Sequence, residues 1–114
     1  MNNLLLAGFE PYRGRKINNS WEVVKHFSCN EYTYILKIPL SFTRGHPGII
    51  AALKEQNYNY VVIVGETSFT NDYERLERLA INYKDSNIHD NDGEIVDDVR
   101  LIENAPNAYF TKLP

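Results

Sequence analysis

A thiol and an imidazole lie close enough in the sequence to act as a nucleophile and its base. Cys29 follows His26 by three positions, a spacing that brings two side chains together on a helix. A histidine that takes the thiol proton turns a cysteine into a nucleophile. The alternative is a partly buried cysteine at a helix end with no chemical role, and the spacing alone favours this second interpretation. Because the chain has one cysteine, it forms no internal disulfide, which fits a reducing compartment.

Other groups that could bind a metal or a phosphate do not form a recognised pattern. The three histidines are far apart in the sequence: His26, His46 and His89. The acidic stretch 85–98 fails as a calcium loop, because Ile88 and Val99 stand where the first and last ligands are required. The loop 8–14 has two glycines but lacks the phosphate-binding GxGxxG and Gly-Lys-Ser/Thr patterns. The sequence therefore indicates neither a metal nor a cofactor, and the acidic stretch is interpreted as a solvated loop.

Length and composition indicate one globular domain over residues 1–114. The hydrophobic fraction of 43% is ordinary for a folded domain, and the net charge of −3 gives no basic surface for nucleic acid. The apolar run Leu4–Ala7 is too short to cross a bilayer, and no basic segment precedes it as in a secretory signal. We therefore expect a cytoplasmic protein that binds neither nucleic acid nor membrane.

Apolar runs and helix signals alternate along the first half of the chain. Strands are predicted at Leu4–Ala7, Tyr32–Leu40 and Tyr60–Val64, with helices over 20–27 and from Pro47-Gly48 onward. The first helix has Asn18, Asn19 or Ser20 as its cap. This order predicts an α/β fold, a three-layer, mostly parallel twisted sheet with flanking helices. The continuously apolar run Tyr60–Val64 predicts a strand covered on both faces.

The second half of the chain is less clearly patterned. Apolar residues in the stretch 73–83 fit a helix, although the same residues also alternate as in a strand, and propensity alone favours the helix. The Asp92-Gly93 pair predicts a hairpin turn, followed by a short strand over 96–102. Residues 105–110 are interpreted as the entry to a helix.

Six sequence blocks, in order and with matching spacing, resemble signatures of the pyroglutamyl peptidase I family of cysteine peptidases. The blocks are Gly8-Phe9-Glu10-Pro11-Tyr12, Asn18-Asn19-Ser20-Trp21-Glu22, Ile38-Pro39-Leu40-Ser41-Phe42, Glu77-Arg78-Leu79-Ala80-Ile81-Asn82, Ile88-His89-Asp90-Asn91-Asp92-Gly93 and residues 105–114. The resemblance covers essentially the whole chain but only the N-terminal half of the family's domain. It implies hydrolysis of an N-terminal pyroglutamyl residue by a Cys-His-Glu mechanism, with pyroglutamyl peptides as substrates.

The resemblance assigns Glu77 to the family's catalytic glutamate, which orients and polarises the histidine. A cysteine peptidase needs such a group to hold the histidine tautomer. It also favours the strand interpretation of 73–83, in which Glu77 shares a face with Leu79 and Ile81. The family's nucleophilic cysteine and its histidine belong to the half that would follow Pro114. Cys29 matches neither position, so the chain alone is expected to be inactive.

The resemblance also implies a substrate pocket. Phe9 and Tyr12 match the aromatic residues that enclose the flat, neutral pyroglutamyl ring, and Ile88 matches a further substrate-binding position. Asn18 matches a polar residue that hydrogen-bonds the lactam. Glu66 stands where the family has glutamine, and its backbone can still bind the lactam N–H. The alternative for the two aromatic residues is packing in the core.

Some positions differ from the family pattern. Arg13 replaces a glycine, Asn87 an arginine and His89 a proline, and residues 68–71 replace a Gly-Arg pair. These changes fit a divergent enzyme, but they also fit a chain that no longer catalyses. The alternatives to a peptidase half are a non-catalytic binding or interaction module and a remnant of a truncated gene. A module of this kind would pair with a separate C-terminal half or form a homo-oligomer, because a truncated sheet leaves an exposed edge.

Overall fold

The computed structural model describes residues 3–27, 30–67 and 74–112. Cys29 and the segment 68–71 lie outside the described residues, so neither interpretation of the His26–Cys29 spacing is tested. The elements follow in the order β1 (Leu4–Phe9), α1 (Asn19–Val24), β2 (Thr33–Ile38), α2 (Gly45–Glu55), β3 (Tyr60–Ile63), β4 (Leu79–Ile81), β5 (Tyr83–Ser86), β6 (Val96–Arg100) and β7 (Ala108–Phe110).

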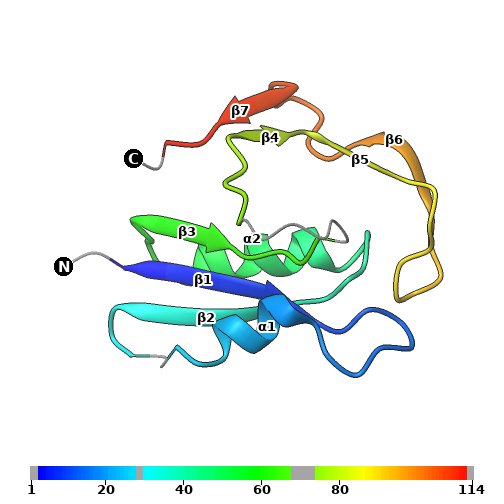
Figure 1. Ribbon diagram of the computed structural model, residues 1–114. Helices are drawn as coiled ribbons and strands as arrows, with labels where there is room; N and C mark the ends of the chain where they lie inside the picture. The colour runs from blue at the N-terminus through cyan, green and yellow to red at the C-terminus, as the bar shows by residue number, and fades with distance from the viewer. Residues whose placement is uncertain (1–2, 28–29, 68–73, 113–114) are drawn as a thin grey trace.

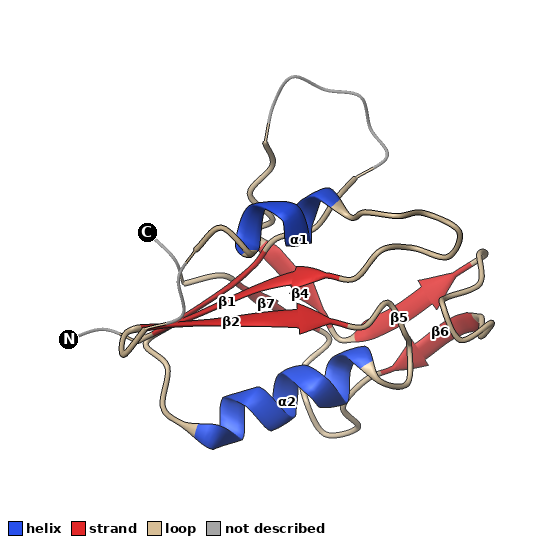
Figure 2. Cartoon of the chain, turned by 90° about the horizontal axis from the view of Figure 1, so that it is seen from below, coloured by secondary structure: helices blue, strands red, loops and turns tan. Residues whose placement is uncertain are grey.

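A parallel sheet in the order β2-β1-β3 forms the centre of the fold. Figure 2 shows α1 and α2 on opposite faces of this sheet, which gives the three-layer α/β arrangement that the sequence predicts. Gly8 lies on the α1 face, where a Cβ atom would stand 2.8 Å from the carbonyl oxygen of Ser20. The central strand β1 supplies three of the six buried apolar side chains among the described residues, because a helix covers each of its faces.

The second half of the chain forms two antiparallel pairs outside the parallel sheet. β5 pairs with β6, and the predicted turn at Asp92-Gly93 lies between them, with Gly93 at a φ of 83°. β4 pairs with β7, and Figure 1 shows this pair beyond β3. The strand interpretation is therefore confirmed from Leu79 onward, whereas Glu77 itself precedes β4 and is not part of a strand.

Three expectations need correction. Residues 105–110 do not enter a helix: Ala108–Phe110 is strand β7, because its backbone pairs with β4. The strand Tyr60–Val64 is not covered on both faces, since Ile63 is 46% exposed and β3 lies at the end of the described sheet. The first helix ends at Val24 rather than at Phe27, whose side chain is 51% exposed.

None of the helices within the described ranges is long and apolar enough to cross a membrane.

Candidate functional site

A pocket of about 560 Å³ opens at the carboxyl ends of β1 and β2. This is the edge of a parallel sheet where α/β proteins usually bind ligands. The pocket wall is mainly apolar, and it includes three of the residues that the sequence assigns to substrate binding: Phe9, Tyr12 and Ile88. A mostly apolar cavity with a few polar groups suits a flat, neutral ring.

The aromatic wall is fixed from both sides by hydrogen bonds. Phe9 is the last residue of β1, and its backbone N–H donates to Ser20 Oγ at 2.9 Å. The Tyr12 hydroxyl donates to the carbonyl oxygen of His89 at 2.7 Å. The second bond joins the loop after β1 to the hairpin loop that carries Ile88. Two segments far apart in the sequence are thereby held against one pocket.

Glu10 and Asn91 connect the three loops at this end of the sheet. Glu10 Oε1 accepts the backbone N–H of Leu40 at 3.0 Å and the side-chain amide of Asn91 at 2.9 Å. The Asn91 amide also donates to the carbonyl oxygen of Pro11 at 2.9 Å. Because both side chains satisfy backbone groups of neighbouring loops, they hold the pocket's rim in place.

Asp90 organises the hairpin loop beside the pocket. It is buried, and it accepts backbone N–H groups from Phe42 at 2.7 Å, from Glu94 at 2.8 Å and from Asp92 at 2.9 Å. Burial acts to raise the pKa of Asp90, but the three amide bonds outweigh it and leave the pKa below its ordinary value. The ionised carboxylate is therefore the form that holds this loop.

Asp92 forms an ion pair across the same loops. Its carboxylate accepts from Arg44 at 2.8 and 3.0 Å and from the Ser41 hydroxyl at 2.5 Å. The bond from Arg44, and after it that from Ser41, lowers the pKa of Asp92. The same bond to Asp92 raises the pKa of Arg44. The planar guanidinium matches the carboxylate with two donors, so the pair fixes an orientation as well as a charge.

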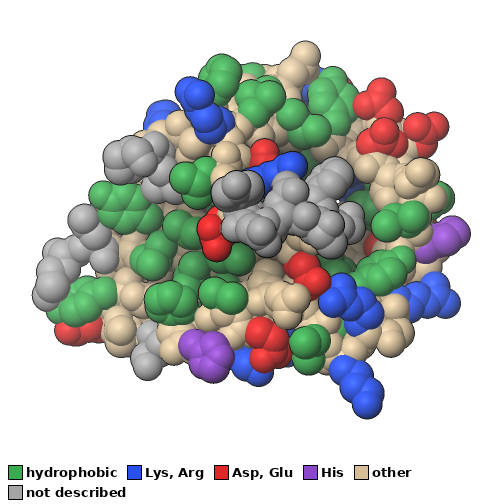
Figure 3. Space-filling model, viewed as in Figure 1, with side chains coloured by type: hydrophobic (Ala, Val, Ile, Leu, Met, Phe, Trp, Pro, Cys, Tyr) green, Lys and Arg blue, Asp and Glu red, His purple; other side chains and the backbone are tan. Residues whose placement is uncertain are grey.

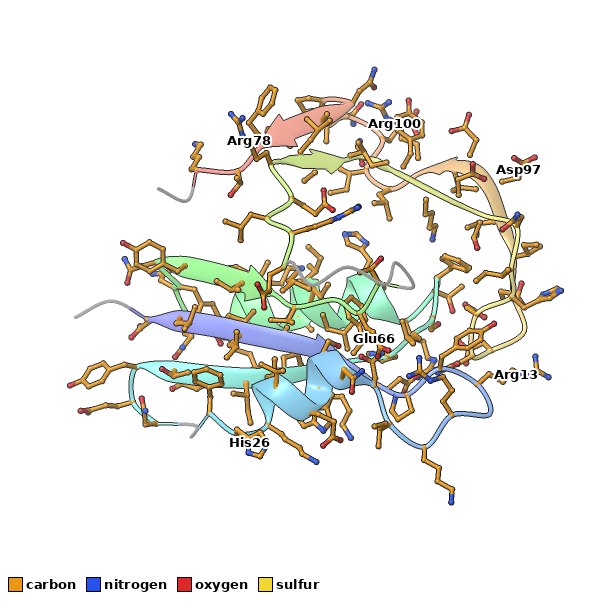
Figure 4. The ribbon with its side chains drawn as sticks, in the orientation of Figure 1. Arg13, His26, Glu66, Arg78, Asp97 and Arg100 are labelled. Carbon is orange, nitrogen blue, oxygen red and sulfur yellow. The ribbon has the colours of Figure 1, made fainter. Side chains whose placement is uncertain are left out.

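Asn18 and Glu66 lie outside the pocket wall and make contacts around α1. Asn18 Oδ1 caps the helix by accepting Ser20 N–H at 2.9 Å, as the sequence predicts, and its Nδ2 donates to the carbonyl oxygen of Glu10 at 3.2 Å. Glu66, which Figure 4 shows close to α1, accepts Asn19 N–H at 2.8 Å and pairs with Arg15 at 3.0 Å. The Asn19 bond, and then that from Arg15, lower the pKa of Glu66. The assignment of Asn18 and Glu66 to lactam binding stays a prediction.

Glu77 lies in the segment that leads into β4. Its side chain is exposed and is not part of the pocket wall, and within the described part of the chain its carboxylate forms no hydrogen bond or ion pair. A carboxylate with no partner of its own is available to an incoming cationic or N–H group. The catalytic assignment of Glu77 therefore stays a prediction.

Two polar residues near the site were not identified from the sequence. Lys84 lines the pocket and donates to the carbonyl oxygen of Phe42 at 2.7 Å. Asn82 is buried, and its side chain both accepts from and donates to the backbone of Ile102, at 2.9 and 2.8 Å. Asn82 is the last residue of the Glu77–Asn82 block, and the resemblance of that block to the family signature could have identified it. Across the described ranges, no group of three His, Cys, Asp or Glu side chains could hold a metal ion.

Comparisons with known proteins agree with the resemblance. The profile of the family described as pyroglutamyl peptidase matches residues 2–114. The pyrrolidone-carboxylate peptidase of Bacillus cereus strain G9842 is 36% identical over 118 residues, covering 100% of this chain and 54% of that protein. The crystal structure of the pyrrolidone carboxyl peptidase of Fervidobacterium islandicum AW-1 superposes with a TM-score of 0.86 and 34% identity, over 98% of this chain and 55% of that one. Bacillus amyloliquefaciens pyroglutamyl peptidase I gives a TM-score of 0.82 and 27% identity, over 100% and 57% of the two chains. The chain thus spans about half the length of these relatives.

Proposed function

This chain belongs to the pyroglutamyl peptidase family, and we propose that it forms the half of a cysteine peptidase that recognises the pyroglutamyl group. The observation that carries this proposal is the pocket at the carboxyl end of the sheet, in which Phe9, Tyr12 and Ile88 meet. The two aromatic rings offer flat apolar surfaces to the uncharged lactam. A charged N-terminal ammonium would lose its hydration in such a pocket, and the lining carboxylate, that of Asp90, already accepts three backbone N–H groups, so free N-termini are disfavoured.

In the complete reaction, a cysteine thiolate attacks the carbonyl carbon that links pyroglutamate to the next residue. The amine of the shortened peptide leaves with a proton from the histidine, and water then hydrolyses the thioester to release pyroglutamate. In this scheme Glu77 accepts a hydrogen bond from the histidine and holds its tautomer. The cysteine and the histidine correspond to the half of the relatives that this chain does not span, so we expect the chain to bind substrate without turnover. We also expect it to act in the cytoplasm.

Binding of a pyroglutamyl peptide tests the proposal directly. We expect the 114-residue chain to bind a pyroglutamyl dipeptide more tightly than the matched prolyl dipeptide, which lacks the lactam carbonyl and carries a charged amine. Phe9→Ala should weaken that binding about tenfold, because it removes one face of the ring contact. Phe27→Ala, at an exposed aromatic residue of the α1 region, is the matched control and should leave affinity unchanged.

Calorimetry or chemical-shift titration measures both affinities. Equal binding of the two dipeptides, or equal effects of the two substitutions, would overturn the assignment of the pocket. A pyroglutamyl-amide assay completes the test, and turnover by the chain alone would contradict the division of roles between the two halves.

A further inference from the structure

The wall of the pocket includes a lysine besides its aromatic and apolar side chains. Lys84 belongs to β5, and its Nζ donates to the carbonyl oxygen of Phe42 at 2.7 Å. An ammonium group has three N–H donors, so two of them remain for a ligand. Lys84, Ser86 and Ile88 follow one another at intervals of two residues, and all three line the pocket. The ammonium and the apolar wall at Ile88 therefore belong to one cavity.

The ammonium of Lys84 is half-buried and has no carboxylate partner. Within the described ranges, Lys84 takes part in none of the ion pairs with an N···O distance up to 4.0 Å. The carboxylate in the described wall of the pocket is that of Asp90, which already accepts three backbone N–H groups. Asp85 and Asp98 border a neighbouring cavity with Lys84, but both are exposed, and Figure 3 shows acidic side chains on the outer surface over β6. A cation that is partly desolvated and unpaired favours the binding of an anion.

The first turn of α2 also favours a negative charge in this pocket. Gly45 and His46 line the pocket, and within the described part of the chain the imidazole of His46 forms no hydrogen bond or ion pair. This turn contains no acidic residue, and no side-chain hydrogen bond caps it. The N-terminus of a helix carries a partial positive charge, and the charge of Asp92 beside it is balanced by Arg44. Two independent features, the helix end and Lys84, therefore attract an anion to the same cavity.

The pocket is also large enough for more than the lactam ring. A cavity of about 560 Å³ has the size of sites that hold drug-sized ligands, and a single small ring fills only part of it. The remaining volume can hold a polar substituent of a ring that lies against Phe9 and Tyr12. A carboxylate is the substituent that suits an unpaired ammonium, because it accepts charge-assisted hydrogen bonds.

We propose that Lys84 binds the carboxylate of free pyroglutamate, the acid that the proposed reaction releases, while its ring lies against Phe9 and Tyr12. This inference rests on the proposed function, because that function places the ring at the aromatic wall. In the substrate, the same carbon belongs to a neutral amide, which an ammonium attracts less strongly than a carboxylate. The pocket therefore holds the acid product more tightly than the neutral group of the substrate, and free pyroglutamate competes with pyroglutamyl peptides.

Calorimetry with pyroglutamate and pyroglutamide tests the carboxylate site. The two compounds share the lactam ring, and only the first is charged at neutral pH. We expect the chain to bind the acid about tenfold more tightly than the amide, the effect of about one charged hydrogen bond. Lys84→Met should bring the affinity for the acid down to that for the amide. Lys54→Met, at an exposed position in the last turn of α2, makes the same change in net charge and should keep the preference.

Two further measurements separate the charge of Lys84 from a structural effect of its loss. Lys84→Arg keeps a cation at this position and should keep a preference for the acid, and added salt should weaken binding of the acid but not of the amide. Equal binding of both compounds by the unmodified chain, or the same loss of preference in Lys84→Met and Lys54→Met, would overturn the carboxylate site and leave the proposed function standing. If the chain bound neither compound, the proposed function would fail together with this site.

Discussion

The polar residues around the pocket hold loops in position, and their charge state decides how well they do so. Asp90 replaces water for three backbone N–H groups, and in the loops beside it Glu10 accepts the N–H of Leu40 and Asn91 accepts that of Arg13. A buried N–H group without an acceptor is costly. Removing one of these acceptors therefore destabilises the fold by more than the net contribution of the bond itself. The shape of the pocket at Tyr12 and Ile88 is therefore tied to the ionisation of a few carboxylates.

The stability of the chain should depend on the charge of Asp90. Because the pKa of Asp90 is lowered in the folded state, its contribution is complete above the unfolded-state pKa of about 3.9 and is lost as the pH falls through the lower folded value. Asp90→Asn should therefore melt at a lower temperature than the wild type at about pH 7, and the gap should narrow below about pH 4. Thermal melts from neutral to strongly acidic pH measure this. Asp97→Asn, at an exposed residue, is the control, and a gap that stays constant with pH would contradict the role of the charge.

Asn18 provides a second test at a single residue. Its Oδ1 accepts from the backbone of Ser20, so Asn18→Ala should destabilise the chain by about 1–2 kcal/mol through loss of the helix cap. Asn18→Asp keeps the acceptor oxygen and should cost less than half as much. Urea denaturation separates the two variants. If both lost the same stability, the Nδ2 bond to Glu10 rather than the cap would be the important contact.

The close packing of α1 against β1 depends on one glycine. A Cβ on Gly8 would meet the Ser20 carbonyl oxygen at 2.8 Å, so Gly8→Ala must push α1 away from the sheet and should cost about 1–3 kcal/mol. Gly48 within α2 has no atom within 4 Å of the same position, so Gly48→Ala should instead stabilise the chain by up to about 1 kcal/mol. Denaturation midpoints measure both changes. Two variants with the same sign would show that the close approach at Gly8 is relaxed in solution.

The elements that local sequence determines were predictable, and those that pairing determines were not. The run of apolar residues in β1 and the Asn18 cap of α1 are local signals, and both predictions were confirmed. Residues 105–110 carry a proline and an alanine that suggest a helix start, but pairing with β4 makes Ala108–Phe110 a strand. The exposure of β3 could not be predicted either, since an apolar strand has the same sequence pattern whether its cover is present or not.

The candidate site was predictable only in part, for a similar reason. The resemblance named Phe9, Tyr12 and Ile88, and the fold brings these three together because parallel strands end at the same edge. It did not indicate that Glu66 pairs with Arg15 and caps α1, since that contact depends on where the loop after β3 passes. Roles that need the second half of the family domain, that of Glu77 above all, cannot be inferred from this half alone.

Across the whole molecule, buried apolar side chains and buried polar side chains are unevenly divided between the first half of the chain and the second. Among the described residues, every buried hydrophobic side chain belongs to the first 52 positions: Leu5, Leu6, Ala7, Val24, Ile38 and Ala52. In the later strands and loops that the structure describes, the buried side chains are polar, those of Asn82 and Asp90. Burial of apolar area is the main source of stability, whereas a hydrogen bond contributes about 1 kcal/mol net. The β4–β7 and β5–β6 pairs are therefore the less stable part.

This division predicts stepwise opening, which native-state hydrogen exchange can resolve. Amides in β1 should exchange only through global unfolding, whereas those of β4 and β7 should exchange through local opening, at least a hundredfold faster, because that pair lacks a buried apolar layer. Low concentrations of urea should leave the β4 and β7 rates nearly unchanged and should accelerate β1 strongly, since exchange through local opening exposes little surface. If all three strands instead shared one rate and one urea dependence, the chain would unfold as a single unit, and the β4–β7 pair would be as stable as β1 without a covering layer.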